Sequence, residues 1–304
     1  METINSMQEN KLFSLRMFMI LLILLPCLLA QGKDKPRKCI LVFGSHADDV
    51  EQMAGGTFAK YMADGYQGIY VCVMNNLSGN RIEKFPGNWN FKEDTLTSGV
   101  TSSPKMYQVG ALETMQIRKE EALRACKILG AEPVFLDFCE PEIWLGRKLI
   151  IYGTEDYIKF NPPGRKHVSL GTRYSEDVNF VVELLKKYQP EITIIHTVGG
   201  EKLEHGGSAY LMYIAYKKAI SRDIEFGKLW MRVRGWLLDD EAQKSGRGKA
   251  DVRIDIKDFE RIKYEALGQH LSQKGSIDVD QAIRDHTKSY GSFEEFITVI
   301  DNTK

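Results

Sequence analysis

The sequence predicts an α/β fold in which a mostly parallel β-sheet is covered by helices on both faces. From about residue 39 onward, short apolar runs alternate with longer amphipathic segments. This alternation is typical of parallel strands joined by helices. Hydrophobic residues make up 43% of the 304 residues, so the chain can bury a sizeable core. The first strand is not followed by a Gly-x-Gly-x-x-Gly motif. The sequence therefore lacks the fingerprint of a dinucleotide-binding fold.

The predicted elements follow one another along the chain. The first strand covers residues 39–43, where an apolar run is ended by a Gly-Ser pair, and a helix is predicted at 50–64. A second strand at 67–74 is followed by a long polar segment at 77–112, which predicts a functional or mobile loop. The other predicted elements are helices at 116–129, 175–188, 208–221 and 258–268 and strands at 133–138, 191–196, 230–236 and 251–256.

Polar residues follow four of these strands, at the point where each strand ends. In chain order they are His46, Asp48 and Asp49, then Asn75 and Asn76, then Glu140, and finally the segment from His196 to His205. The carboxyl ends of parallel strands lie along one edge of a sheet, which is where ligands bind in open α/β folds. We therefore expect these groups to converge on one cleft.

The tetrapeptide His46-Ala47-Asp48-Asp49 carries most of a hydrolytic metal site. His46 and Asp49 can both reach one metal ion, and Asp48 can take a proton from a water on that metal. The alternative is that Asp49 caps the following helix. Two adjacent carboxylates beside a histidine repel unless a cation is present, which favours the metal site. Either His196 or His205 could supply a third ligand.

The N-terminal segment differs from the rest of the chain. Lys11 and Arg16 precede an apolar stretch from Met17 to Ala30, which is shorter than the ~20 residues that a membrane-spanning helix needs. This pattern predicts a signal peptide at residues 1–31, with a retained signal anchor as the alternative. We therefore expect an exported protein in the periplasm, the cell envelope or the extracellular space, and a membrane partner only if the anchor is retained.

The charge balance argues against one class of partner. Lys and Arg together number 41, as do Asp and Glu. Proteins that bind nucleic acids usually carry a basic excess, so we expect no nucleic-acid partner.

Five weak motifs in a fixed order carry a family resemblance. They are His46-Ala47-Asp48-Asp49-Val50-Glu51, Asn75-Asn76-Leu77-Ser78-Gly79, the helix with Arg118, Glu121, Ala125, Leu129 and Gly130, the strand that ends near Glu140, and Lys263 with His270-Leu271-Ser272-Gln273. In these motifs the chain resembles the PIG-L/LmbE-like family of zinc-dependent N-acetylglucosaminyl deacetylases. The resemblance implies a Rossmann-like (LmbE-like) domain at residues 32–304, Zn²⁺ or another divalent metal as cofactor, and an N-acetylated amino sugar or glycoconjugate as partner.

The resemblance also implies roles for single residues. Asp48 is the expected general base, and His270 a second catalytic residue. His46 and Asp49 are expected to bind the metal. The residues expected to bind substrate are Arg118, Glu140 and Asn76.

The distal motif of the family, His-x-Asp-His, is altered in this chain. The best match is Lys202-Leu203-Glu204-His205, which makes His205 the third metal ligand. Lys202 then stands where the family has the histidine that is associated with protonating the leaving amine or stabilising the oxyanion, and His196 and His270 are substitutes for the role of proton donor. In the other register, His205 takes the place of that first histidine and Ser208 takes the ligand position. We favour the first register because it keeps three N/O ligands.

The predicted function is that of a metal-dependent hydrolase which removes the N-acetyl group from an N-acetylglucosamine-type sugar or glycoconjugate. Two alternatives stay open. The altered distal motif is compatible with a catalytically degenerate glycan-binding module on the same fold. The same metal chemistry could also hydrolyse the amide or ester of another substrate.

Overall fold

The computed structural model describes most of the chain after the N-terminal segment. The described residues are 38–77, 81–82, 88–90, 95–97, 106–107, 111–140, 142–145, 148–151, 167–171, 173–197, 203–222, 226–233 and 249–303. The predicted signal peptide at residues 1–31 and the proposed acid Lys202 lie outside these ranges. Among the described residues, none of the helices combines the length and the hydropathy that a membrane crossing requires.

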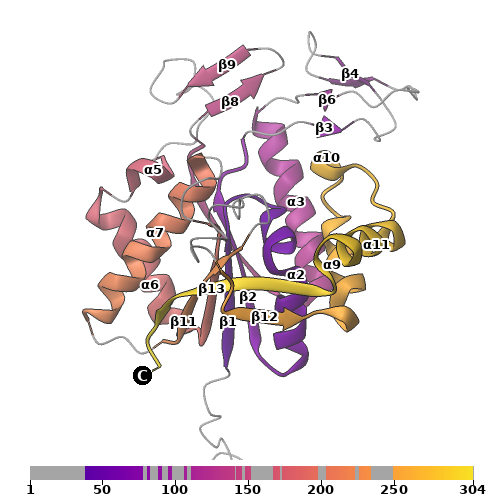
Figure 1. Ribbon diagram of the computed structural model, residues 1–304. Helices are drawn as coiled ribbons and strands as arrows, with labels where there is room; N and C mark the ends of the chain where they lie inside the picture. The colour runs from indigo at the N-terminus through magenta and orange to yellow at the C-terminus, as the bar shows by residue number, and fades with distance from the viewer. Residues whose placement is uncertain are drawn as a thin grey trace, which may run out of the picture. The chain divides into compact units, whose positions relative to one another are not determined.

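A seven-stranded sheet forms the centre of the fold (Figure 1). Its strand order is β12-β13-β11-β10-β1-β2-β7. The parallel strands are β1 (Cys39–Gly44), β2 (Gln67–Met74), β7 (Glu132–Phe138), β10 (Ile192–Ile195) and β11 (Lys228–Arg232). Strand β13 (Phe293–Asp301) lies antiparallel between β11 and β12 (Val252–Asp255). The sheet is thus mixed and mostly parallel, as the sequence predicted.

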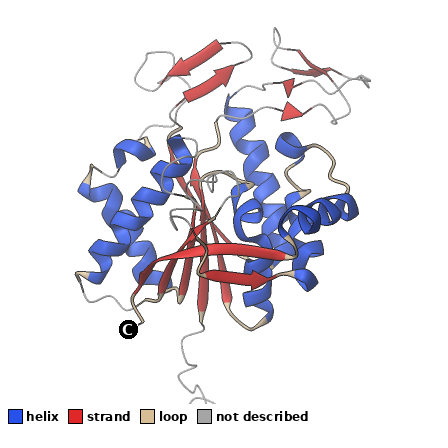
Figure 2. Cartoon of the chain, viewed as in Figure 1, coloured by secondary structure: helices blue, strands red, loops and turns tan. Residues whose placement is uncertain are grey.

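Helices cover both faces of the sheet (Figure 2). On one face lie α6 (Ser175–Tyr188) and α7 (Leu203–Ile220), and on the other α2 (Asp49–Ala63), α3 (Ala111–Leu129) and α9 (Glu260–Leu267). The side chains of β1 alternate between the two layers. Leu41 and Phe43 pack into the core under α6 and α7, whereas Ile40 and Val42 pack into the other core. All four are fully buried, and burying each stabilises the fold by about 1.5–3 kcal/mol. This two-sided burial explains why the strand is a continuous apolar run.

The remaining elements are short or lie late in the chain. Antiparallel pairs join β3 (Arg81–Ile82) to β6 (Met106–Tyr107), β4 (Asn88–Asn90) to β5 (Thr95–Thr97), and β8 (Glu142–Leu145) to β9 (Lys148–Ile151). The other helices are α5 (Val168–Gly171), the 3₁₀ helix η1 (Lys257–Phe259), α10 (Leu271–Lys274) and α11 (Val279–Tyr290). The described residues of the segment 77–112, predicted as an irregular loop, therefore include four short strands, and α3 begins before residue 116.

One helix boundary differs from the prediction in a way that changes the site. The helix predicted at 208–221 begins at Leu203, so His205 lies in the first turn of α7 and not in a loop. Gly206 and Gly207 lie just before the predicted start, and glycine disfavours a helix by about 1 kcal/mol per residue. Here the helix continues through both glycines, and Ser208 and Ala209 directly after them are fully buried. Tertiary packing thus outweighs the low helix propensity of the two glycines.

Helix α2 is kinked and is held at its kink by the last strand. Ala54 has non-helical torsion angles (φ −151°, ψ 20°). The carboxylate of Glu294 in β13 accepts hydrogen bonds from the backbone N–H groups of Gly56 and Thr57, at 3.2 and 2.7 Å. Lys263 of α9 donates to the same carboxylate at 2.5 Å, and both charged side chains are only 4% exposed. A buried ion pair therefore fixes the helix whose first residue is Asp49.

Candidate metal centre

The turn between β1 and α2 places the side chains of His46 and Asp49 next to each other. Gly44 allows the turn to close, because an added Cβ at this position would lie 3.2 Å from the Cβ of Asp49. Inside the turn, the backbone N–H of His46 donates to Oδ2 of Asp49 at 2.7 Å. From outside, the Oδ1 atom of Asn76 accepts the backbone N–H of Ala47 at 2.9 Å. The turn is thus fixed by hydrogen bonds from both sides.

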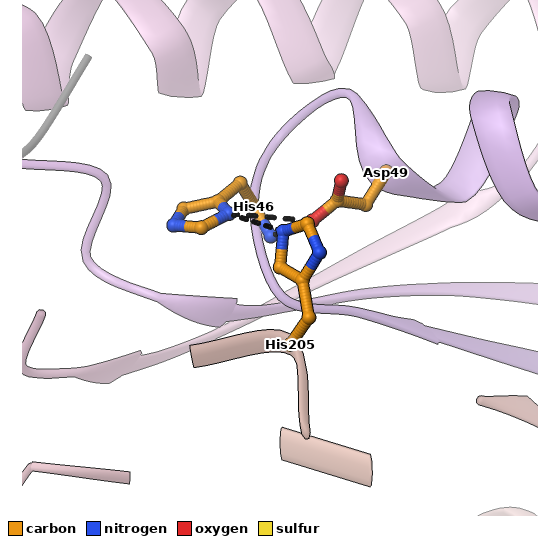
Figure 3. Close-up of side chains that lie close together, drawn as sticks. All are labelled: His46, Asp49 and His205. Carbon is orange, nitrogen blue, oxygen red and sulfur yellow. Dashed lines mark hydrogen bonds and ion pairs between the residues drawn. The ribbon is translucent and has the colours of Figure 1, made fainter. Parts of the chain in front are cut away.

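Three buried donor atoms meet at the end of this turn (Figure 3). Nδ1 of His46 lies 3.3 Å from Oδ2 of Asp49. Nε2 of His205 lies 3.4 Å from the same oxygen and 3.3 Å from Nδ1 of His46. With zinc–ligand bonds of about 2.0–2.1 Å, the edge of a coordination tetrahedron measures about 3.3–3.4 Å. Two imidazole nitrogens and a carboxylate oxygen at this spacing therefore fit one zinc ion.

The electrostatics of the cluster favour a positive charge at this position. Burial lowers the pKa of His46, but the carboxylates of Glu140 and Asp49 raise it to about 10. Burial also raises the pKa of Asp49, yet His205 and His196 hold it well below its ordinary value. The cluster therefore keeps ionised carboxylates in a buried place, where a positive charge, either a protonated His46 or a bound metal ion, balances them.

The structure separates the three candidates for the third ligand. His196 lies 3.3 Å from Oδ2 of Asp49, but its Nε2 accepts the backbone N–H of Ser45 at 3.2 Å and its ring stacks on His205 at 4.2 Å. The hydroxyl of Ser45 donates to Ser208 Oγ at 2.8 Å, one helical turn beyond His205. Of the three, His205 is the residue whose donor atom approaches both other ligands, which is the register that we favoured from the sequence.

Asp48 lies beside this cluster in a shell of basic and amide groups. Arg118 Nη2 contacts its Oδ1 at 3.1 Å, and Lys274 Nζ and Gln52 Nε2 contact its Oδ2 at 2.9 and 2.8 Å. Burial and the charge of Asp49 raise the pKa of Asp48, but Lys274 and Arg118 outweigh them and lower it. Asp48 is therefore ionised at neutral pH. Sequence reasoning missed Gln52 and Lys274, although Lys274 directly follows the last family motif.

Two residues that were expected to bind substrate contact the protein itself. The amide of Asn76 accepts from Ala47 and donates to the carbonyl oxygen of Met74 at 2.9 Å, so it fixes the turn. Oε2 of Glu140 lies 3.1 Å from Nε2 of His46, and Glu140 is buried. Both side chains thus have partners within the protein, and direct substrate contact by either residue stays a prediction.

His270 is fully buried and does not face the three donor atoms. Its Nε2 lies 3.2 Å from Oε1 of Glu51, whose other oxygen accepts the Tyr70 hydroxyl at 3.2 Å. Burial lowers the pKa of His270, but Glu51 raises it above the ordinary value. His270 thus contacts Glu51 of α2 rather than the three donor atoms, and its catalytic role stays a prediction.

Two family motifs that are far apart in the sequence meet in the structure. Glu121 of α3 accepts hydrogen bonds from the backbone N–H and the hydroxyl of Ser272, at 2.8 and 2.6 Å. This contact ties α3 to α10 and so brings Arg118 and Lys274 to the two oxygens of Asp48.

A pocket of about 360 Å³ adjoins the site. Gln52 lines it and also contacts Asp48, so the pocket and the proposed base share one side chain. The other lining residues include Tyr264 and the ion pair of Lys263 with Glu294. None of the three donor residues lines this pocket, so it lies next to the candidate metal centre and does not contain it.

Comparison with known proteins decides the family. The family model for PIG-L, described as GlcNAc-PI de-N-acetylase, matches residues 41–215, which is more than half of the chain. The chain belongs to the PIG-L family. The matched part of this PIG-L protein contains His46, Asp48, Asp49 and His205.

Solved structures share the fold at low sequence identity. An N,N'-diacetylchitobiose deacetylase from Pyrococcus horikoshii is 15% identical with a TM-score of 0.53, and the match covers 88% of this chain and 85% of that one. A deacetylase of teicoplanin biosynthesis is 14% identical with a TM-score of 0.54, covering 87% and 100%. The 4-carboxy-2-hydroxymuconate hydratase of Pseudomonas putida is 18% identical with a TM-score of 0.52, covering 88% and 98%. These likenesses establish the LmbE-like fold.

Proposed function

We propose that this PIG-L protein is a metal-dependent hydrolase which removes the N-acetyl group from an N-acetylglucosamine-type sugar or glycoconjugate. The observation that carries the proposal is the triangle of donor atoms from His46, Asp49 and His205, with the ionised carboxylate of Asp48 beside it. Three ligands from the protein are typical of catalytic rather than structural zinc sites.

In the proposed reaction the metal and Asp48 have different roles. A divalent metal, for which zinc is our first choice, would activate a water molecule and polarise the amide carbonyl when it is bound. Asp48 accepts the proton of the attacking water as general base. Its Oδ2 already accepts hydrogen bonds from Lys274 and Gln52, whereas Arg118 is the partner of Oδ1 among the described residues. We therefore assign the proton to Oδ1, which has the more open lone pair.

Arg118 and Lys274 hold Asp48 ionised and in place. Arg118 Nη2 bonds the oxygen to which we assign the proton, so its guanidinium is also close enough to touch a bound substrate. Lys274 is 29% exposed at the side chain, so it can also meet the substrate from the solvent side. For the proton that the departing amine requires, Lys202 remains our proposal.

The substrate class is proposed from the family and the neighbouring structures. The family model names a GlcNAc-PI de-N-acetylase, and two of the neighbours are named as deacetylases of chitobiose and of teicoplanin biosynthesis. An N-acetylated amino sugar is the substrate feature that best accounts for these names. We further propose that residues 1–31 direct the protein to export, so that its substrate is a glycoconjugate outside the cytoplasm.

Metal content and acetate release test the proposal. Purified protein is titrated with zinc, and acetate is measured with N,N'-diacetylchitobiose and a panel of other N-acetylated sugars. We expect one zinc per chain and turnover on at least one sugar. Zinc binding without acetate release on the whole panel would favour the glycan-binding alternative, and release from simple amides or esters alone would favour a different hydrolase.

The variant Asp48→Asn separates binding from catalysis. Asparagine has nearly the same shape but cannot accept the proton at neutral pH. We expect the zinc content to persist and turnover to fall by about 10²–10⁴-fold. Activity near that of the wild type would remove Asp48 from the role of general base.

A further inference from the structure

Glu140 lies where it can act on the metal centre through His46. It follows β7 directly and is only 1% exposed. Its Oε2 atom lies 3.1 Å from Nε2 of His46, and both side chains are almost entirely buried. The contact joins the ends of two strands, β1 and β7, that are separated in the sheet by β2.

The two nitrogens of the His46 ring face different partners. Nδ1 faces Asp49 and His205, at 3.3 Å from a donor atom of each. Nε2, on the other side of the ring, faces Glu140. A proton on Nε2 that is donated to Glu140 leaves the lone pair of Nδ1 directed at the other two donors. Histidines that bind metals usually donate their second N–H group to a carboxylate or carbonyl in this way.

The backbone around Glu140 is built to bring the carboxylate to this place. Asp137 adopts a left-handed conformation (φ 55°), and the register of β7 against β2 shifts at the same point. The carbonyl of Phe138 then accepts the backbone N–H of Asn75 at 2.8 Å. The backbone of Cys139 pairs with that of His167 in an isolated parallel β-bridge. The strand thus turns at its end and is held on both sides immediately before Glu140.

We propose that Glu140 is a positioning residue which fixes the tautomer and the orientation of His46 for the metal, and that it does not bind the substrate. This inference rests on the metal site of the proposed function. It replaces the expectation from the sequence, in which the carboxylate binds a sugar hydroxyl. Burial of Glu140 and its contact with His46 both argue against a hydroxyl partner.

Zinc affinity and the Michaelis constant distinguish the two roles. Replacing the carboxylate partner of a metal-bound histidine typically weakens metal binding by about 10–100-fold. For Glu140→Gln we therefore expect the Kd for zinc, measured by competition with a chromophoric chelator, to rise by about 10–100-fold. At saturating zinc we expect KM to stay within about threefold of the wild type, because the positioning partner does not touch the substrate.

Two further variants control the experiment. Glu140→Asp keeps the charge but shortens the side chain, and we expect it to restore part of the zinc affinity that glutamine loses. Glu260→Gln makes the same chemical change at another buried glutamate, one that contacts Thr287. We expect Glu260→Gln to leave zinc affinity unchanged, and thermal denaturation of all variants checks that they are folded.

The outcomes separate this inference from the proposed function. Unchanged zinc affinity with a raised KM in Glu140→Gln would overturn the positioning role and restore the role in substrate binding. If Glu140→Gln does not fold, a zinc affinity of Glu140→Asp equal to that of the wild type would overturn the inference, and a weaker affinity would support it. Failure of the wild type to bind zinc would overturn both proposals, whereas zinc binding without acetate release would overturn the deacetylase alone.

Discussion

Replacing His205 with alanine tests which residue of α7 completes the metal centre. His205 Nε2 lies 3.4 Å from Oδ2 of Asp49 and 3.3 Å from Nδ1 of His46, so the variant removes one of three ligands. Sites with four ligands bind zinc with about 10–16 kcal/mol, or about 2.5–4 kcal/mol per ligand. We therefore expect the Kd for zinc to rise by roughly 10²–10³-fold.

The matched control is Ser208→Ala, one helical turn further along α7. Its hydroxyl accepts a hydrogen bond from Ser45 and donates one to the carbonyl of Glu204, each at 2.8 Å. Losing these bonds costs about 1 kcal/mol of stability each. Because Ser208 is not among the three donors, we expect less than about a twofold change in zinc affinity.

Zinc competition with a chelator, with circular dichroism as the check on folding, measures both variants. If Ser208→Ala loses the metal while His205→Ala retains it, the reasoning is refuted. His205 would then move to the role of proton donor, and the metal would require a ligand arrangement other than the one in Figure 3.

Two further predictions concern the rest of the chain. Burial raises the pKa of Glu294, but Lys263 lowers it below its ordinary value. The ionised Glu294 therefore stabilises the fold at a pH above the pKa that this residue has in the unfolded chain. This stabilisation is lost as the pH falls through the lower pKa that Glu294 has in the folded protein. Glu294→Gln should thus cost about 3–5 kcal/mol at pH 7, and urea denaturation should find a smaller difference below about pH 4; equal stabilities at pH 7 would contradict this. Residues 1–31 should be absent from exported protein by N-terminal sequencing, and an intact Met1 in a membrane fraction would support a signal anchor instead.

The sequence predicts the centre of the sheet well because its strands are buried on both faces. Strand β2 has the predicted bounds, and β1, β7 and β10 differ from their predictions by a residue at one or both ends. The first motif also identifies the group of His46, Asp48 and Asp49, because its three polar side chains interrupt an otherwise apolar region. Such local patterns require no knowledge of distant parts of the chain.

The rest of the site depends on contacts between distant segments, which no local pattern encodes. Lys274 reaches Asp48 because Glu121 holds α10 through Ser272. Glu140 meets His46 because the end of β7 turns at Asp137. Neither contact has a sequence spacing that could be recognised in advance, and so the partners of Asp48 and of His46 had to come from the structure.

Strand β13 and α11 also escaped prediction. The segment 293–301 mixes charged and apolar residues, and its antiparallel place between β11 and β12 interrupts the strand–helix alternation that predicted the rest of the sheet. Strand preference depends strongly on the neighbouring strands, and here β13 pairs antiparallel with both β11 and the short β12.

The clamp on the kink of α2 has a consequence for the order in which the protein can be completed during synthesis. Asp49 leaves the ribosome early, whereas Glu294, which holds the kink of the same helix, is made only near the end of the chain. Strand β12 also waits for β13, its partner in the sheet. A nascent chain that already contains the whole segment matched by the family, residues 41–215, therefore still lacks the clamp on the helix that begins at Asp49. We therefore expect the helix that begins at Asp49 to reach its final geometry only after the last strand has been made.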